Sequence, residues 1–90
     1  MTIKNNYLGM KLEIISPEKI YFDGEVSLVT LPGKSGKFTV LEHHAPIVSM
    51  LDKGVINYRI NGIDNQLDIE AGFVEVNKNK IVVCVEKLNK

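Results

Sequence analysis

Two β-prone runs meet at an Asn-Gly pair in the segment Val55-Ile56-Asn57-Tyr58-Arg59-Ile60-Asn61-Gly62-Ile63-Asp64-Asn65-Gln66-Leu67-Asp68-Ile69-Glu70-Ala71. A two-residue type I′ turn needs positive φ at both central positions, and Asn-Gly tolerates that geometry best. After the pair, apolar residues at 67, 69 and 71 alternate with polar residues at 66, 68 and 70. Alternation of this kind puts one face of a strand in a core and the other in water. The segment therefore predicts a β-hairpin.

The same pattern extends outward over the rest of the chain. Apolar residues recur with period two or in short runs, and Gly, Pro, Asn or Asp interrupts them every few residues. Asp23-Gly24 and Asn77-Lys78-Asn79 are expected to form further hairpins, and no segment supports a long amphipathic helix. We therefore predict an all-β fold, a flattened antiparallel β-sandwich or barrel of about nine or ten short strands. The strands are expected at residues 11–15, 19–22, 25–31, 37–41, 46–50, 55–60, 64–71, 73–76 and 81–86.

The last of these strands differs from the others. Ile81-Val82-Val83-Cys84-Val85 is apolar at both alternating sets of positions. Such a strand is covered on both sides, either at the centre of a sandwich or where a partner docks. Both interpretations predict that Cys84 is buried.

A second segment, Leu31-Pro32-Gly33-Lys34-Ser35-Gly36-Lys37-Phe38-Thr39-Val40-Leu41-Glu42-His43-His44-Ala45-Pro46, contains both histidines and two of the three prolines of the chain. Pro32 and Gly33 end one apolar run, and Gly36 permits a tight reversal before the next. We expect a protruding loop at this strand junction.

Composition restricts the possible functions. The chain has 90 residues, enough for one domain with a modest core. Its 11 basic and 11 acidic residues give a net charge of zero, and scattered lysines make nucleic acid an unexpected partner. The N-terminus lacks a signal-peptide pattern. A membrane span needs about 20 largely apolar residues, and every apolar run in the sequence is far shorter. The single cysteine, Cys84, rules out an internal disulfide and is compatible with the cytoplasm.

No catalytic or metal constellation can be assembled from the sequence. His43 and His44 are adjacent, so on a strand they would point to opposite faces, and no third histidine completes a zinc site. Cys84 lies in a Val-rich strand, where burial would raise the pKa of a thiol and block access to it. The acidic residues occupy isolated, alternating positions. We expect no catalytic residue, no metal and no cofactor.

Five sequence blocks, taken together and in order, resemble the epsilon subunit of bacterial F-type ATP synthases. They are Ile15-Ser16-Pro17-Glu18-Lys19-Ile20, Gly24-Glu25-Val26, Leu31-Pro32-Gly33-x-x-Gly36-x-Phe38, His44-Ala45-Pro46-x-x-x-x-Leu51-x-x-Gly54 and Ala71-Gly72-Phe73-Val74-Glu75-Val76. Each block alone is weak, but the ordered set spans nearly all of residues 11–86.

The resemblance implies a β-sandwich at the foot of the central stalk, a rotor component without an active site of its own. Its partners would be the gamma subunit and the ring of c subunits, within an assembly with alpha and beta at the cytoplasmic face of the bacterial inner membrane, so that membrane contact would come only through the complex. Position by position, the resemblance places Gly33, Lys34, Ser35, Gly36 and Lys37 near the c-ring. It places His44, Ser49, Glu70, Ala71, Gly72 and Phe73 on or beside the gamma-facing side.

Two of these positions also have a simpler interpretation, in which Gly72 only turns the chain and Phe73 only fills the core. The sequence also departs from the family at places. Lys37 stands where relatives often carry an acidic residue, and Glu42-His43 stand where relatives often have Pro-Gly.

The family pattern also divides the chain. Met10 stands where family members often begin, which predicts an N-terminal extension at residues 1–9 and a β-sandwich domain at residues 10–90. Most relatives continue into an inhibitory C-terminal helical hairpin, which the 90 residues do not include. We therefore expect coupling of ion flow, by protons or sodium ions, to ATP synthesis without inhibition of ATP hydrolysis.

Two other hypotheses remain beside a coupling subunit. One is a free-standing β-sandwich that binds some other protein, and the other is a small metal enzyme at His43 and His44. An exposed apolar face meant for gamma could also cause weak self-association of the isolated chain.

Overall fold

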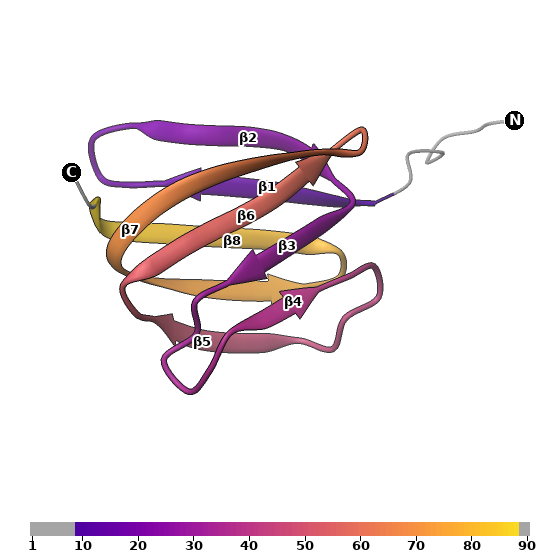
Figure 1. The fold of residues 1–90 in the computed structure, drawn as a ribbon. Coiled ribbons are helices and arrows are strands. Elements are labelled where there is room, and N and C mark those ends of the chain that lie inside the picture. Colours follow the sequence, from indigo (N-terminus) through magenta and orange to yellow (C-terminus); the bar gives the residue numbers. More distant parts are fainter. Residues whose placement is uncertain (1–8, 89–90) are drawn as a thin grey trace, which may run out of the picture.

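The computed structural model of the chain describes residues 9–88 and builds this part entirely from strands and their connections (Figure 1). None of it forms a helix with the length and hydropathy needed to cross a membrane. Of the predicted N-terminal extension, residues 1–8 lie outside the described residues. The strands are β1 (Met10–Ile15), β2 (Ile20–Val26), β3 (Leu28–Leu31), β4 (Phe38–Val40), β5 (Ile47–Leu51), β6 (Gly54–Ile60), β7 (Ile63–Asn77) and β8 (Lys80–Leu88).

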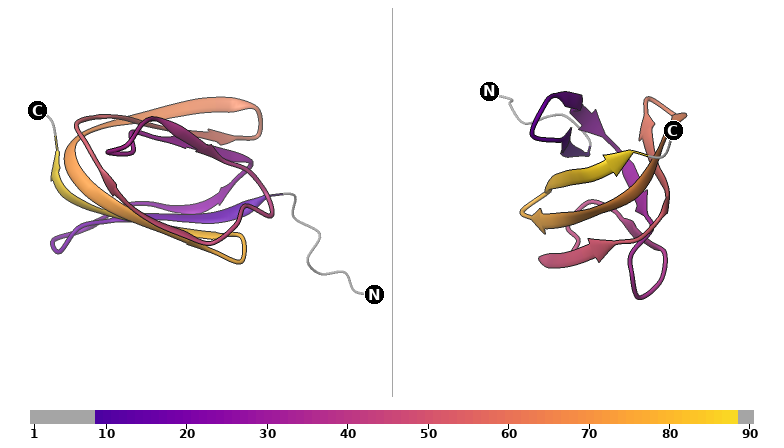
Figure 2. Two further views of the ribbon diagram at one scale, coloured as in Figure 1. Left: turned by 90° about the horizontal axis from the view of Figure 1, so that it is seen from below. Right: turned by 90° about the vertical axis from the view of Figure 1, so that its left-hand side faces the viewer.

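The strands form one folded 8-stranded sheet whose two halves face each other as the layers of a sandwich (Figure 2). One layer has the order β2-β1-β8-β7-β5, and the other has the order β7-β6-β3-β4. Strand β7, 15 residues long, therefore belongs to both layers. Its first half pairs with β6, and its second half pairs with β8 on one side and β5 on the other. The predicted all-β sandwich is confirmed.

The passage of β7 from one layer to the other occurs at residues 69–72. Ile69 is the last residue paired with β6, opposite Gly54, and the first paired with β8, opposite Leu88. The register with β8 then shifts on both sides of Ala71, as expected where a bulge bends a strand. At Gly72 an added Cβ would lie 2.6 Å from the carbonyl oxygen of Cys84, so only glycine lets β7 and β8 approach this closely at the bend.

The core between the layers is wholly aliphatic, and the described residues bury no polar or charged side chain in it. At the open side of the sandwich, Phe22 of β2 and Tyr58 of β6 close the gap with ring centroids 4.6 Å apart. The fully buried side chains come from nearly every strand and include Met10, Leu12, Ile14, Val29, Leu31, Val40, Ile56, Ile69, Val74, Val76, Ile81 and Val83.

Both turns with asparagine form as predicted. Asn61 and Gly62 have φ of 50° and 81°, and Lys78 and Asn79 have φ of 52° and 61°. These are the positive values that a type I′ turn requires.

Several sequence expectations are corrected by the structure. The predicted hairpin at Asp23-Gly24 is wrong, since both residues lie inside β2, opposite Glu13 and Leu12. The break in this region falls at Ser27, where the chain leaves one layer for the other. The predicted strands at residues 64–71 and 73–76 are one bent strand, so the described part of the chain, residues 9–88, forms eight strands. The sheet is also not purely antiparallel, because β1 and β8 run parallel.

The expectation that the sandwich itself buries Cys84 is wrong, since this residue is only half-buried. Along β8, Ile81, Val83 and Val85 point into the core, and Val82 and Cys84 therefore lie on the outer face. The sequence correctly showed that both faces of this strand are apolar, but only one face is covered by the chain itself.

We expect Gly72→Ala to lower the free energy of unfolding by about 1–3 kcal/mol, because the new Cβ would push against the Cys84 carbonyl. Urea denaturation followed by circular dichroism measures this change. Gly24→Ala is the matched control in β2, because its added Cβ would meet only the far end of the Phe22 ring, at 3.0 Å. Equal losses in the two variants would contradict the proposed role of the bend.

Candidate partner-binding surfaces

An apolar row crosses the outer face of the β2-β1-β8-β7-β5 layer. The strand register places Ile15 opposite Cys84, Cys84 opposite Phe73 and Phe73 opposite Met50. Directly opposed residues of neighbouring strands project from the same face of a sheet, so these four side chains form one line. We call Ile15, Cys84, Phe73 and Met50 the apolar row.

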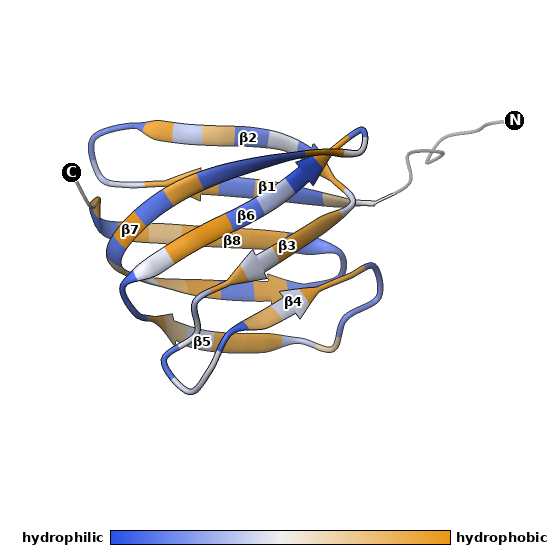
Figure 3. Cartoon of the chain, viewed as in Figure 1, coloured by the Kyte–Doolittle hydropathy of each residue, from blue (hydrophilic) through white to orange (hydrophobic). Residues whose placement is uncertain are grey.

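Apolar side chains on either side widen this row. Val48 is 72% exposed and Met50 is 53% exposed on β5, and Ile20, opposite Ile15, is 63% exposed. Val82 adds a half-buried side chain on β8. In Figure 3, β8 and much of β5 are coloured as hydrophobic, in contrast to the hydrophilic start of β7. Contiguous apolar surface of this kind is typical of a site where another protein binds.

The edge of the apolar row toward the 78–79 turn is hollowed and charged. Beside the apolar row on the same face, Glu75 of β7 is paired with Val82 of β8 on one side and with Val48 of β5 on the other. A hollow of about 430 Å³ is lined by Glu75, Asn77, Lys78, Lys80 and Val82. A smaller hollow of about 220 Å³ is lined by Pro46, Ile47, Val48, Glu75, Val76 and Asn77. The two hollows share Glu75 and Asn77, so together they extend across the sheet from β8 to β5.

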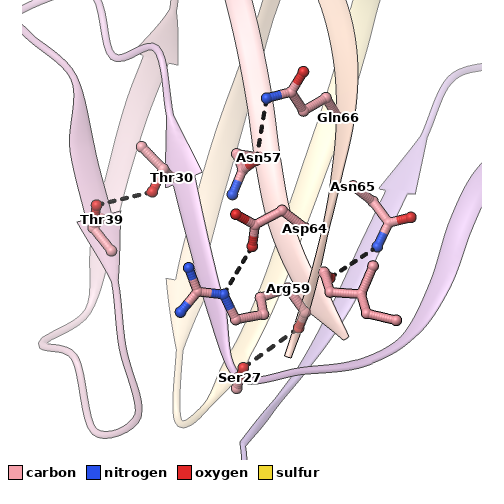
Figure 4. A network of polar contacts seen from close by, with 9 residues as sticks. Ser27, Thr30, Thr39, Asn57, Arg59, Asp64, Asn65 and Gln66 are labelled. Carbon is pink, nitrogen blue, oxygen red and sulfur yellow. Dashed lines mark hydrogen bonds and ion pairs between the residues drawn. The ribbon is translucent and has the colours of Figure 1, made fainter. Parts of the chain in front are cut away.

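The outer face of the opposite layer has a different chemistry, shown in Figure 4. Thr30 and Thr39 are joined by a hydrogen bond of 2.9 Å, and the Gln66 side-chain amide donates to Asn57 Oδ1 at 3.4 Å. Arg59 Nε donates to Asp64 Oδ1 at 2.8 Å. These polar groups form hydrogen bonds with one another. Of the two outer faces, the one with the apolar row is therefore the better candidate for binding a protein.

The predicted protruding loop forms between β3 and β4 and projects from one end of the sandwich (Figure 1). Its base is fixed to the end of β5, because Lys34 N–H donates to the Met50 carbonyl at 2.9 Å and Asp52 N–H donates to the Pro32 carbonyl at 2.8 Å. Gly36 N–H closes the tip by donating to the Gly33 carbonyl at 3.0 Å. Residues Lys34, Ser35, Gly36 and Lys37 are exposed. The loop thus presents two lysines on a fixed base.

Of the positions predicted to face gamma, Ser49, Gly72 and Phe73 lie in the β5–β7 ladder, and these three do not share one face. β5 is about 13 Å long at 3.3 Å per residue. His44 precedes its start, whereas Gly72 is opposite Leu51 at its end. Ser49 is opposite the buried Val74 and so points toward the core side.

The bend of β7 separates the remaining gamma-facing positions. Gly72 is buried, Glu70 and Ala71 are half-buried at the bend, and Phe73 projects outward in the apolar row. The idea that Phe73 only fills the core is therefore wrong, whereas Gly72 does turn the strand.

The histidine pair lies in the connection between β4 and β5. His43 is exposed with φ of 67°, and its backbone N–H donates to Asn79 Oδ1 at 2.7 Å. His44 Nδ1 lies 2.7 Å from the Ala45 carbonyl oxygen. Within residues 9–88, no three His, Cys, Asp or Glu side chains gather closely enough to hold a metal ion.

Sequence reasoning missed the part of the apolar row that β5 supplies. The signal was present, because Val48 and Met50 alternate with Ile47 and Leu51, so this short strand is apolar on both faces. That pattern was recognised only in β8. Ile15 and Met50 belong to one row only because of the pairing register of β1, β8, β7 and β5. A local sequence pattern does not contain that register.

Comparison with known proteins agrees with these features. The family model described as the β-sandwich domain of the ATP synthase delta/epsilon chain matches residues 9–90, and the chain belongs to this family. Curated relatives named ATP synthase epsilon chain include one from Sulfurovum sp., 44% identical over 86% of this chain, and one from Carboxydothermus hydrogenoformans, 36% identical over 82%. The chain spans 61% and 55% of the lengths of these two relatives.

A relative from Chlorobium limicola, also named ATP synthase epsilon chain, is 35% identical over 90% of this chain and 93% of its own length. The fold is similar to a chain of the Euglena gracilis mitochondrial ATP synthase, with a TM-score of 0.83 over 98% of this chain and 58% of that one. A chain from the central stalk and c-ring structure of the Tetrahymena thermophila enzyme gives a TM-score of 0.75 over 90% of this chain and 66% of that one. Their identities, 18% and 17%, make these likenesses evidence of fold.

We expect the Asp64 carboxyl to titrate below its ordinary pKa, because Arg59 donates a hydrogen bond to its charged form. Any stability from this pair is present above the unfolded-state pKa of Asp64 and is lost as the pH falls through the lower folded-state value. Carbon-detected NMR titration of Asp64 should show a higher pKa in Arg59→Gln than in the parent. Arg59→Lys, which keeps the charge but loses the guanidinium hydrogen bond, should fall between them. An unchanged Asp64 pKa in Arg59→Gln would contradict the pairing.

Proposed function

We propose that this chain acts as a non-catalytic rotor subunit of an F-type ATP synthase, joining gamma to the c-ring and coupling proton or sodium-ion flow to ATP synthesis. Family membership supports the proposal most directly. The surface agrees with it, since the described residues offer an exposed apolar region and a loop with two exposed lysines. In a bacterial cell this position lies at the cytoplasmic face of the inner membrane.

We propose that the apolar row is the surface that binds gamma. The reason is energetic. The apolar row crosses several strands and is partly exposed in the isolated chain, so covering it with another protein gains hydrophobic stabilisation. Phe73 lies inside the row between β8 and β5, and the more than half-exposed Met50 ends the row, with Val48, also more than half exposed, beside it on β5. Central, well-packed side chains carry most of the binding energy in protein interfaces.

The loop of Gly33, Lys34, Ser35, Gly36 and Lys37, exposed over residues 34–37, is proposed to contact the c-ring. Its base is held by the backbone hydrogen bonds to β5, so the loop can transmit force from the sandwich without first becoming ordered. A photoactivatable residue at position 35, in the exposed tip, should cross-link to a c subunit in the assembled enzyme. Cross-links to alpha or beta alone would contradict this proposal.

The second candidate function is a free-standing module that uses the apolar row for an unrelated protein. The apolar row by itself fits that function equally well, because sheet register and exposure do not identify the partner. Only family membership favours the ATP synthase.

We expect Val48→Asp to weaken binding of the chain to an epsilon-free alpha-beta-gamma complex by at least about tenfold, because a carboxylate would be desolvated in the interface. Surface plasmon resonance with the immobilised complex measures the dissociation constant. Ile63→Asp is the matched control, since Ile63 is 67% exposed against 72% for Val48 but belongs to the half of β7 in the opposite layer. If the two variants lose affinity equally, the outer face that carries the apolar row and Val48 is not the gamma-binding surface.

A further inference from the structure

The connection between β4 and β5 contains a residue in an unusual backbone conformation, which is contacted both from within the connection and from a distant turn. His43 has φ of 67°, in the left-handed region that L-residues with a Cβ rarely occupy. Such a conformation persists only where surrounding contacts enforce it. Within the connection, His44 N–H donates to the Leu41 carbonyl at 3.1 Å and so closes a turn.

The outside contact comes from Asn79, on the distant β7–β8 turn. Its Oδ1 accepts the His43 backbone N–H at 2.7 Å, a short hydrogen bond between residues separated by 36 positions. Its backbone carbonyl also accepts Lys11 N–H at 3.0 Å, which ties the same turn to the start of β1. Asn79 is half-buried and itself has φ of 61°, a value that asparagine and glycine tolerate best. One residue therefore connects three segments that are far apart in the sequence.

The connection held in this way borders the candidate interface. Leu41, 53% exposed, and the exposed Glu42, Ala45 and Pro46 present it to solvent. Pro46 lines the hollow of about 220 Å³ together with Val48, which flanks the apolar row. The conformation of residues 41–46 thus shapes one end of the surface that contains Val48 and Met50.

We propose that Asn79 is a positioning residue for partner binding. Through Oδ1 it holds His43 in the left-handed conformation, and residues 41–46 are thereby preset to contact the partner. The inference rests on the proposed function, in that the partner is the gamma subunit. A loop that already has its bound conformation loses little conformational entropy when the complex forms, so the affinity is not reduced by the cost of ordering it.

Two substitutions separate the side-chain hydrogen bond from the turn. Asn79→Gly keeps the positive φ and the carbonyl that accepts Lys11 N–H, and it removes only the acceptor for His43. Asn79→Asp keeps an acceptor oxygen at the same place. Asn61→Gly is the matched control, because Asn61 occupies the other asparagine turn, with φ of 50°, at the tip of the β6–β7 hairpin.

The direct readout is hydrogen exchange of the His43 amide, measured by NMR on the free chain. We expect it to be several-fold faster in Asn79→Gly than in the parent, Asn79→Asp or Asn61→Gly. The functional readout is the dissociation constant for the epsilon-free alpha-beta-gamma complex. It should rise roughly 2- to 10-fold in Asn79→Gly, the range that corresponds to one lost hydrogen bond, and stay near the parent value in the other two.

The outcomes are distinguishable. If Asn79→Gly binds as tightly as the parent, or if Asn79→Asp is as weak as Asn79→Gly, the positioning role is overturned and the proposed function stands. If the parent chain itself does not bind the complex, the proposed function is overturned together with the inference. Thermal unfolding of each variant shows whether the fold is intact, and an unchanged His43 exchange rate in folded Asn79→Gly also overturns the inference.

Discussion

The structure depends on the bend of β7 at residues 69–72, where one strand leaves one layer of the sandwich and enters the other. Ile69 pairs with both β6 and β8, and three residues later Gly72 lies against the Cys84 carbonyl and opposite Leu51 of β5. A side chain at Gly72 would force β7 and β8 apart at this point. Without the bend, the layer that contains β6, β3 and β4 could not fold over the layer that contains β8 and β5, and the core between the two layers could not form.

The bend also explains why the two outer faces differ. The first half of β7 carries alternating polar residues that join Asn57 and Arg59 of β6 in a hydrogen-bonded surface. The second half places Phe73 between Cys84 and Met50. One strand thus contributes to a water-compatible face in one layer and to an apolar face in the other. The polarity of each face follows from the sequence on either side of Gly72.

Local patterns predicted much of this fold and little of the candidate site. The Asn61-Gly62 hairpin and the 78–79 turn were predictable because turn chemistry depends on adjacent residues. Asp23-Gly24 misled the prediction, since the pairing of β2 with β1 outweighs a local turn preference. The parallel pairing of β1 with β8 and the contact of His43 with Asn79 join residues distant in the sequence, which no local pattern reports.

The central claim, that this chain is a rotor subunit, is tested most directly by purifying the tagged chain from detergent-solubilised membranes of its own host. Mass spectrometry of the purified material, with an assay of ATP hydrolysis, identifies what assembles with it. The account predicts that alpha, beta, gamma and c subunits co-purify in an active complex. Recovery of the chain alone, with the complex assembled without it, would contradict the claim and favour a free-standing binding module.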